Sequence, residues 1–408
     1  MPAAFAPIAA GVIFAGTYLV LAIGKLPGFR LDRTGAALLG ASLMVACGAL
    51  TPEAAFHAID GDTIALLLGM MIVVANLKLS GFFRLATNWV AQHARHPLIL
   101  LIAIVLASGV FSAVLVNDTV CLALAPLVFD VVTRLRRNPV PYLLAVAMAS
   151  NCGSTATITG NPQNIAIGSL SRIPYGSFAA TLSPIALAGL LLTIALIALF
   201  HPREFWTRVR LEGEREPVAY HRALMIKTLL VTAALVVLFF AGIAPAKVAI
   251  LAGGLLLLTR IVKNTKIYFE IDWPLLLMFA GLFIVVAGFE KTLLSPAVIT
   301  AVGGLHLERI AVLSGVTAVL SNIVSNVPAV LVMSPFIQPL PDPKTAWLTV
   351  AMASTLAGNF TVLGSVANLI VVQKAAAKDI HIGFWDYFTV GAPLTLLSII
   401  FGAFWLAA

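Results

Sequence analysis

Polar residues that could bind a small solute are concentrated in four short segments of an otherwise apolar chain. Two are the runs Asn151–Asn164 and Ser354–Asn368, which are rich in Asn, Ser, Thr and Gly. The other two are Asn117–Thr119 and Ser321–Pro328. Amide and hydroxyl side chains supply hydrogen-bond donors and acceptors without the cost of a buried charge. Glycine and proline would unwind a helix here, so that carbonyls could coordinate a cation and helix N-termini could face an anion.

We therefore expect these segments to form one solute site. The expected substrate-binding residues are Asn117, Thr119, Asn151, Ser154, Thr155, Thr157, Asn161, Asn164, Ser325, Asn326, Asn359, Thr361, Ser365 and Asn368. The expected ion-coupling positions are Asp118, Gly153, Gly160, Gly358 and Gly364. Eight of these residues are predicted to lie around one cavity: Asn117, Asp118, Asn151, Thr155, Asn164, Asn326, Asn359 and Asn368. For a single residue such as Ser150, tight helix packing is an equal alternative.

Asp118 is the one carboxylate in the four segments. Ionisable residues inside a membrane are costly and usually functional. We expect Asp118 to bind and release a proton during the working cycle, with Na⁺ as the alternative coupling ion. A purely structural alternative is that Asp118 caps a helix N-terminus. The matching segment near Asn326 has no acid, so coupling would be asymmetric.

The sequence predicts no cofactor, no metal site and no enzymatic activity. The cysteines Cys47, Cys121 and Cys152 have no spacing typical of a disulfide framework or a zinc site. Cys121 and Cys152 lie close to the polar segments, and thiols bind trivalent arsenic, but a buried cysteine is more often a small packing residue. No His-Glu-x-x-His, Gly-x-Ser-x-Gly or paired-carboxylate motif is present.

The elements that position these residues must cross a membrane. Of the 408 residues, 61% are hydrophobic and 10% charged, and the mean hydropathy is +1.03, whereas soluble domains have about 25% charged residues. Each long apolar run can cross about 30 Å of hydrocarbon as a helix. These runs include Ile8–Gly24, Gly35–Thr51, Thr63–Leu79, Phe178–Phe200 and Leu224–Ala241. The first has no basic flank or cleavage site, so it is expected to be retained rather than removed as a signal peptide.

The net charge of +8 does not indicate nucleic-acid binding, because the basic residues lie in short loops between apolar runs. Placing these loops in the cytoplasm requires ten crossings and puts both termini outside the cytoplasm. It also requires Pro97–Leu135 and Arg309–Leu340 to be re-entrant hairpins. Phe82–His96 is expected to lie along the membrane surface, and Leu211–Pro217 to be a solvated connector. We expect a multi-pass protein of the prokaryotic inner membrane.

The chain matches itself at an offset of about 204 to 212 residues. Val146–Ser150 recurs as Val350–Ser354, followed by matching Gly and Asn residues; Ile59-Asp60 recurs as Ile271-Asp272. The fold class expected is therefore an all-α polytopic protein of two inverted-topology repeats with re-entrant hairpins and broken helices. The expected parts are an N-terminal span and loop (1–33), repeat one (34–205), a connector and linking span (206–243) and repeat two (244–408). Repeat one holds the hairpin 97–135, the broken helix 141–171 and the span 176–200; repeat two holds the hairpin 309–340, the broken helix 345–374 and the span 384–407.

These segments resemble those of the ion transporter superfamily, which includes arsenite permeases of the ArsB type, citrate and divalent anion/sodium symporters, and sodium/proton antiporters. Asn117-Asp118-Thr119 is similar to its hairpin-tip motif, and Gly153–Asn164 to its glycine-rich break that ends in Pro–x–Asn. Ser325–Pro328 and Gly358–Asn368 fill the matching places in the second repeat. The resemblance implies an elevator mechanism, in which a domain holding both hairpins slides against a scaffold that is often dimeric.

The resemblance implies ion-coupled secondary transport of a small inorganic or organic solute. The acidic hairpin tip and the compact length favour proton-coupled efflux of arsenite or antimonite. The alternative is sodium- or proton-coupled transport of a di- or tricarboxylate or another anion, and an ion channel is a remote third. Besides membrane lipid, a homodimer and a peripheral ATPase are the partners left open, and no nucleic acid is expected.

Overall fold

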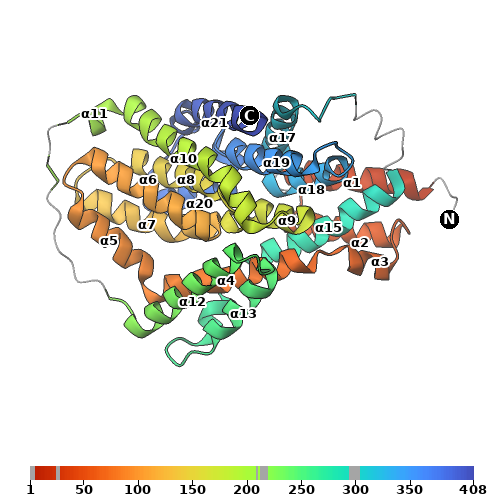
Figure 1. Cartoon of the computed structure of the whole chain (residues 1–408), viewed down its shortest axis with the longest axis horizontal. Helices are drawn as coiled ribbons and strands as arrows, with labels where there is room; N and C mark the ends of the chain where they lie inside the picture. The colour runs from red at the N-terminus through yellow and green to blue at the C-terminus, as the bar shows by residue number, and fades with distance from the viewer. Residues whose placement is uncertain (1–4, 24–27, 208–209, 212–218, 294–303) are drawn as a thin grey trace.

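The computed structural model describes residues 5–23, 28–207, 210–211, 219–293 and 304–408, and over these ranges the only regular elements are helices. Figure 1 shows a packed bundle of helices, several of which run along the long axis of the molecule. The predicted connector at 211–217 falls outside the described residues, apart from Leu211. The all-α class predicted from the sequence is confirmed.

The same series of elements occurs twice, except that α5 has no counterpart among the described residues of the second copy. The first copy comprises α2 (Arg33–Ala46), α3 (Pro52–Ala58), α4 (Gly61–Ser80), α5 (Phe82–His93), α6 (Pro97–Val114), α7 (Asn117–Arg134), α8 (Pro139–Ser154), η1 (Ile158–Gly160), α9 (Pro162–Ser171) and α10 (Tyr175–Phe200). The second comprises α13 (Pro245–Leu257), α14 (Asn264–Tyr268), α15 (Trp273–Leu293), α17 (Ile310–Val324), α18 (Asn326–Ile337), α19 (Pro343–Ala357), η2 (Val362–Gly364), α20 (Val366–Ala376) and α21 (Phe384–Ala407). Helix α1 (Phe5–Ile23) precedes the first copy, and α11 (Pro202–Phe205) and α12 (Arg222–Phe240) separate the two.

The predicted hairpins and broken helices are present in both copies. In each hairpin the two helical arms are separated by a short break, at Leu115-Val116 between α6 and α7 and at Ser325 between α17 and α18. The hairpin tips are these breaks together with the first turn of the following arm, Leu115–Thr119 and Ser325–Pro328. Each broken helix consists of an α-helix, a single 3₁₀ turn and a second α-helix. In the predicted topology the first copy crosses the membrane an even number of times and α12 adds one crossing, which gives the second copy the opposite orientation.

Two glycines show how the copies interlock. A Cβ atom on Gly69 of α4 would lie 2.4 Å from the backbone carbonyl carbon of Ala249 on α13. A Cβ atom on Gly281 of α15 would lie 2.7 Å from the same atom of Ala37 on α2. The number of residues from Gly69 to Gly281 equals the number from Ala37 to Ala249. The pair α4–α13 is therefore the repeat equivalent of the pair α15–α2. Each copy therefore packs a helix against the other copy at a site that only glycine fits.

The helices form two groups. A scaffold group consists of α1, α2, α4, α12, α13 and α15, which pack on one another. A motif group consists of α6–α10 and α17–α21, and it holds all four polar segments. In Figure 1 most of the scaffold group lies along the lower and right parts of the view, and most of the motif group in the upper left and upper centre. The candidate site lies where these two groups meet.

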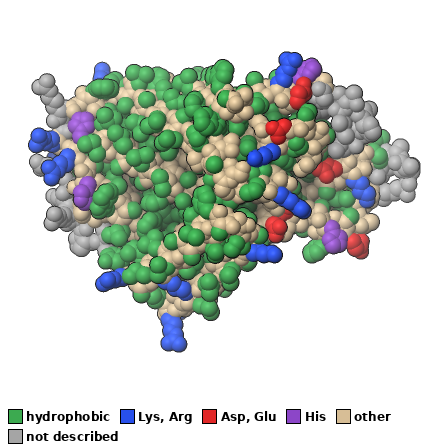
Figure 2. Space-filling view, viewed as in Figure 1, with side chains coloured by type: hydrophobic (Ala, Val, Ile, Leu, Met, Phe, Trp, Pro, Cys, Tyr) green, Lys and Arg blue, Asp and Glu red, His purple; other side chains and the backbone are tan. Residues whose placement is uncertain are grey.

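The surface is that of a membrane protein. Six described helices are long and apolar enough to span a membrane: α4, α6, α10, α12, α15 and α21. Figure 2 shows hydrophobic side chains over most of this face, with most charged side chains toward its ends and lower edge. The predicted span Gly35–Thr51 is shorter than expected, because α2 ends at Ala46 and the chain turns at Gly48 with a φ of 77°. The predicted surface segment Phe82–His96 contains the helix α5.

Candidate functional site

Asn151 is the centre of a buried amide network that joins three of the four polar segments. Its oxygen accepts from Asn117 Nδ2 and from Ser365 Oγ, both at 3.1 Å. Its nitrogen donates to Asn359 Oδ1 at 2.9 Å and to Asn368 Oδ1 at 3.0 Å. All four hydrogen-bonding positions of the Asn151 amide are therefore used. The network ties the first hairpin tip to the breaks of both repeats.

Asn164 and Asn368 complete the two helix breaks in the same way. Asn164 Nδ2 donates to the carbonyls of Ser154 at 3.1 Å and Thr157 at 3.0 Å. Asn368 Nδ2 donates to the carbonyls of Gly358 at 2.7 Å and Thr361 at 3.1 Å. These carbonyls lie where a continuous helix would have paired them with backbone N–H groups, so the asparagines replace the missing donors.

The residues that begin α9 and α20 link the two repeats. Asn161 caps α9 by accepting from Asn164 N at 2.8 Å, and its nitrogen donates to Thr355 Oγ1 at 3.2 Å. Ser365 caps α20 through Ala367 N at 3.2 Å while its hydroxyl donates to Asn151. Asn151 and Thr355 are equivalent positions, because each follows the repeated segment Val-Ala-Met-Ala-Ser. The N-terminus of each second half-helix is thus held by the first half-helix of the other repeat.

The second hairpin tip is held in an unusual backbone conformation. Ser325 has a φ of 77° and a ψ of 160°, a region that residues with a side chain rarely adopt. The amide of Asn326, oriented so that both ends meet complementary groups, donates to Ser354 O and Gly364 O at 3.2 Å. Its oxygen accepts from Gln163 Nε2 at 3.2 Å. Asn326 thereby connects this tip to both broken helices.

A cavity of about 170 Å³ lies between the two tips and the scaffold group. Its polar lining comprises Arg33, Thr34, Asn117, Asp118, Gln163, Asp272, Ser325, Asn326 and Ser365, and its apolar lining includes Leu21, Leu275, Met278 and Val327. Helices α2, α7, α9, α15, α18 and α20 all begin at or within a few residues of this lining. Their N-terminal N–H groups give the cavity a positive electrostatic contribution from the backbone.

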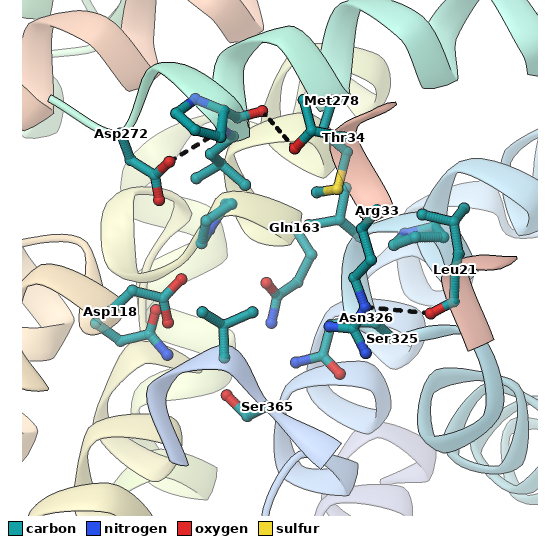
Figure 3. A pocket seen from close by; sticks show the side chains of 17 residues that line it. Leu21, Arg33, Thr34, Asp118, Gln163, Asp272, Met278, Ser325, Asn326 and Ser365 are labelled. Carbon is teal, nitrogen blue, oxygen red and sulfur yellow. Dashed lines mark hydrogen bonds between the residues drawn. The ribbon is translucent and has the colours of Figure 1, made fainter. Parts of the chain in front are cut away.

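Three ionisable side chains border the cavity, and two of them come from the scaffold group. Figure 3 shows Asp118 and Asp272 on one side of the view, Arg33 on the other and Gln163 between them. Arg33 Nε donates to Leu21 O at 3.2 Å, and Asp272 Oδ1 accepts from Leu275 N at 3.0 Å as the cap of α15. Asn117 is buried and lines the cavity, and its Oδ1 accepts no hydrogen bond from any described residue. That oxygen is itself buried, with almost no accessible surface.

Five of the predicted site residues line the cavity: Asn117, Asp118, Ser325, Asn326 and Ser365. Of the eight predicted to lie around one cavity, Asn117, Asp118 and Asn326 do so. Asn151, Asn164, Asn359 and Asn368 are fully or almost fully buried behind it, within the amide network. Thr155 donates to Asn151 O at 3.1 Å, Ser154 to the same carbonyl at 2.9 Å, and Thr157 to Ala113 O. Thr119, Asn161 and Thr361 also lie away from the cavity lining.

The four predicted ion-coupling glycines do not border the cavity either. Two of them stand where only glycine fits. A Cβ atom on Gly153 would lie 2.2 Å from Gly109 O on α6, and one on Gly160 would lie 2.1 Å from Ser154 O. The contacts are looser in the second repeat: a Cβ atom on Gly358 would lie 3.0 Å from Thr355 O, and one on Gly364 would lie 2.8 Å from Gly358 O. These close contacts indicate that the glycines allow the chain to pack tightly at the helix breaks.

The cysteine thiols face away from the cavity lining. Cys121 Sγ lies 3.0 Å from Ser150 Oγ, and Cys152 Sγ accepts from Asn359 Nδ2 at 3.3 Å. Both residues are fully buried. Neither lines the cavity, so the two thiols act as small packing groups beside the amide network.

Four polar lining residues were not predicted: Arg33, Thr34, Gln163 and Asp272. Arg33 was assigned to a cytoplasmic loop because it stands next to other basic residues. Asp272 carried a signal, since Ile271-Asp272 repeats Ile59-Asp60, and Gln163 lies inside the Gly-Asn-Pro-Gln-Asn motif. All four face the site because helix N-termini of the scaffold and of α9 converge on it, which no local pattern reveals.

Known proteins share both the sequence pattern and the fold. Residues 18–357 match the family model described as Citrate transporter. An uncharacterized transporter of Mycobacterium tuberculosis is 33% identical over 98% of this chain and 97% of its own. The silicon efflux transporter LSI3 of rice, Oryza sativa subsp. japonica, is 28% identical over 96% of both chains. The crystal structure of the YdaH transporter of Alcanivorax borkumensis aligns with a TM-score of 0.60 and 14% identity, over 99% of this chain and 97% of that one.

The matching residues include both hairpins, the first broken helix and the lining residues of the scaffold group, and hence all of the cavity lining except Ser365 and Val366. The apolar helices make the chain a multi-pass membrane protein. The resemblance to the ion transporter superfamily is confirmed, and the chain belongs to the citrate transporter family of secondary transporters.

Proposed function

We propose that the chain is a proton-coupled exporter of a small, uncharged, hydroxylated oxyacid, with arsenite and antimonite as first candidates. The observation that carries this proposal is the chemistry of the cavity between the hairpin tips. Most of its polar side chains are amides or hydroxyls that can donate to and accept from solute hydroxyl groups.

The charges in the cavity also support an uncharged solute. Asp118 and Asp272 outnumber Arg33, whose Nε is already bound to a backbone carbonyl. A multiply charged anion would meet two carboxylates there, and like charges close together are unfavourable in a poorly solvated site. The rice relative named as a silicon efflux transporter favours the same class, since silicic and arsenous acids are both uncharged hydroxylated acids near neutral pH.

A citrate-type anion is the second candidate. The family description favours it, and so do the six helix N-termini that begin at or near the cavity. Helix N-termini bind carboxylates without cationic side chains. In this case protons or Na⁺ at Asp118 and Asp272 would have to offset the negative charge of the solute.

The proposed cycle uses Asp118 as the proton carrier and moves the motif group against the scaffold group in an elevator motion. Asp118 lies on a hairpin tip of the motif group, whereas Arg33 and Asp272 belong to the scaffold. The solute would therefore exchange scaffold contacts as the tips move. The proposed setting is the prokaryotic inner membrane, with both termini outside the cytoplasm and with a homodimer or a peripheral ATPase as the partners to test.

Reconstituted proteoliposomes distinguish the two candidates. Radiolabelled or mass-detected arsenite uptake under an imposed pH gradient is compared with citrate uptake, with and without Na⁺. Uptake of arsenite that excess citrate does not inhibit supports the oxyacid proposal. Uptake of citrate alone would replace it with the anion proposal, and flux that does not respond to a pH or Na⁺ gradient would indicate a channel.

A further inference from the structure

A second cavity, of about 390 Å³, is lined by the N-terminal turns of two other helices of the scaffold group. In the predicted topology α2 and α4 are consecutive crossings, which puts their N-termini on opposite sides of the membrane. The first cavity is bordered by the N-terminal turns of α2 and α15, and the second by those of α13 and α4. These helices are repeat equivalents. The second cavity is therefore the scaffold's counterpart of the first.

The correspondence holds residue by residue. The scaffold lining of the first cavity includes Arg33, Thr34, Pro274 and Met278, and that of the second includes Pro245, Ala246, Asp62 and Leu66. Each residue of one set is separated from its counterpart in the other by the same number of positions, and that spacing is also the one that relates Gly69 to Gly281. Two independent features, helix packing and cavity lining, thus give one repeat alignment.

The motif group meets the two cavities differently. Both hairpin tips line the first cavity. From the motif group, the second is lined instead by Ile158 of η1, the C-terminal end of α9 and the start of α10, and by no tip residue. The two repeats therefore have different contacts between scaffold and motif groups, and this difference defines one conformational state of the protein. If each repeat adopts the contacts that the other now has, the opposite state results.

One scaffold contact marks the present state. Asp60 caps α4 through Thr63 N at 2.7 Å, and both of its carboxylate oxygens accept from Ser169 Oγ of α9 at 2.8 Å. The repeat equivalent of Asp60 is Asp272, which caps α15 and faces the first cavity. The equivalent of Ser169 is Gln373 on α20, which is exposed. An amide can donate to a carboxylate as a hydroxyl does.

We propose that Asp60–Ser169 is a contact of this state only, and that Asp272–Gln373 replaces it in the opposite state. In that state the hairpin tips lie beside the second cavity, against Asp62, Leu66, Pro245 and Ala246. Asp60 and Asp272 then act as positioning residues that hold the motif group at either end of its travel. This inference rests on the proposed alternating access but not on the identity of the solute.

Paired cysteines test this directly in membranes, in a chain whose native cysteines are replaced by alanine. Oxidation of Asp60→Cys/Ser169→Cys and of Asp272→Cys/Gln373→Cys is expected to give a disulfide in each, read as a change in gel mobility that reduction reverses. The mixed pair Asp272→Cys/Ser169→Cys is the matched control and is expected to give none. A second pair that is folded in the membrane and reacts with maleimide when reduced, but never cross-links, would overturn the proposal, as would equal cross-linking of the control.

Single substitutions give a second readout that needs no disulfide. Ser169→Ala should raise maleimide labelling of a cysteine at Ala246 and lower labelling of one at Thr34, several-fold in each case. Gln373→Ala should change the two in the opposite sense. The proposal would be overturned if both substitutions changed the labelling in the same direction, or if neither substitution changed it. Neither readout requires arsenite, so a failure here is distinguishable from a wrong substrate.

Discussion

Asn164 and Asn368 occupy equivalent positions, and each donates its amide nitrogen to two carbonyls of its own broken helix. We predict that Asn164→Ala or Asn368→Ala destabilises the protein, because two buried acceptors lose their donor. The cost of leaving a buried polar group unpaired is about 1–3 kcal/mol. A lower melting temperature in detergent would show it, whereas Gln338→Ala, at an exposed position after α18, should melt like the parent. Unchanged melting of both asparagine variants would contradict this role.

Residue chemistry alone identified part of the cavity. Asn117, Asp118, Ser325, Asn326 and Ser365 were found because polar residues inside apolar segments are costly and hence informative. The sequence could not separate the residues that face the cavity from those that build the breaks behind it. Whether an amide faces the cavity or the network depends on how the two repeats pack against each other. The sequence does not reveal this packing, because the repeats are far apart along the chain.

Gly69 and Gly281 occupy equivalent positions, where helices of the two repeats pack closely against each other. Gly69→Val or Gly281→Val should each destabilise the fold, because the new side chain would meet the backbone of Ala249 or Ala37. Overpacking typically costs about 1–3 kcal/mol, and backbone cannot move aside easily. Gly254→Val on α13 is the matched control, since a Cβ atom there meets nothing within 4 Å. Folded yield after detergent extraction should fall for the first two variants only; an equal loss for Gly254→Val would point to helix propensity instead.

Element boundaries were predicted well where the apolar runs were long. The hairpin arms and the spans α10 and α21 lie close to the expected ranges, because their apolar stretches end at Pro, Gly or charged residues. The short helices α3 and α14 were not predicted, since neither is long enough to leave a periodic pattern.

At the scale of the whole molecule, the inverted repeat fixes an odd number of crossings between equivalent elements, and the basic loops suggest which side is cytoplasmic. We predict that both termini lie outside the cytoplasm. Alkaline phosphatase fused after Ala408 should be active, and a fluorescent protein that matures only in the cytoplasm should be dark at the same place. The reverse result at Ala408 would overturn the orientation but leave the repeat intact.

The central claim is that protons drive solute through the cavity between the hairpin tips by way of Asp118. The most direct test is arsenite accumulation in everted membrane vesicles under an imposed pH gradient. Asp118→Asn is compared with Asp130→Asn, which removes an exposed carboxylate on the same helix, outside the cavity. The account predicts accumulation that collapses with the gradient, a loss of at least about tenfold in Asp118→Asn, equal to about 1.4 kcal/mol, and a near-parental rate in Asp130→Asn. Accumulation that persists in Asp118→Asn, or that ignores the pH gradient, would contradict it.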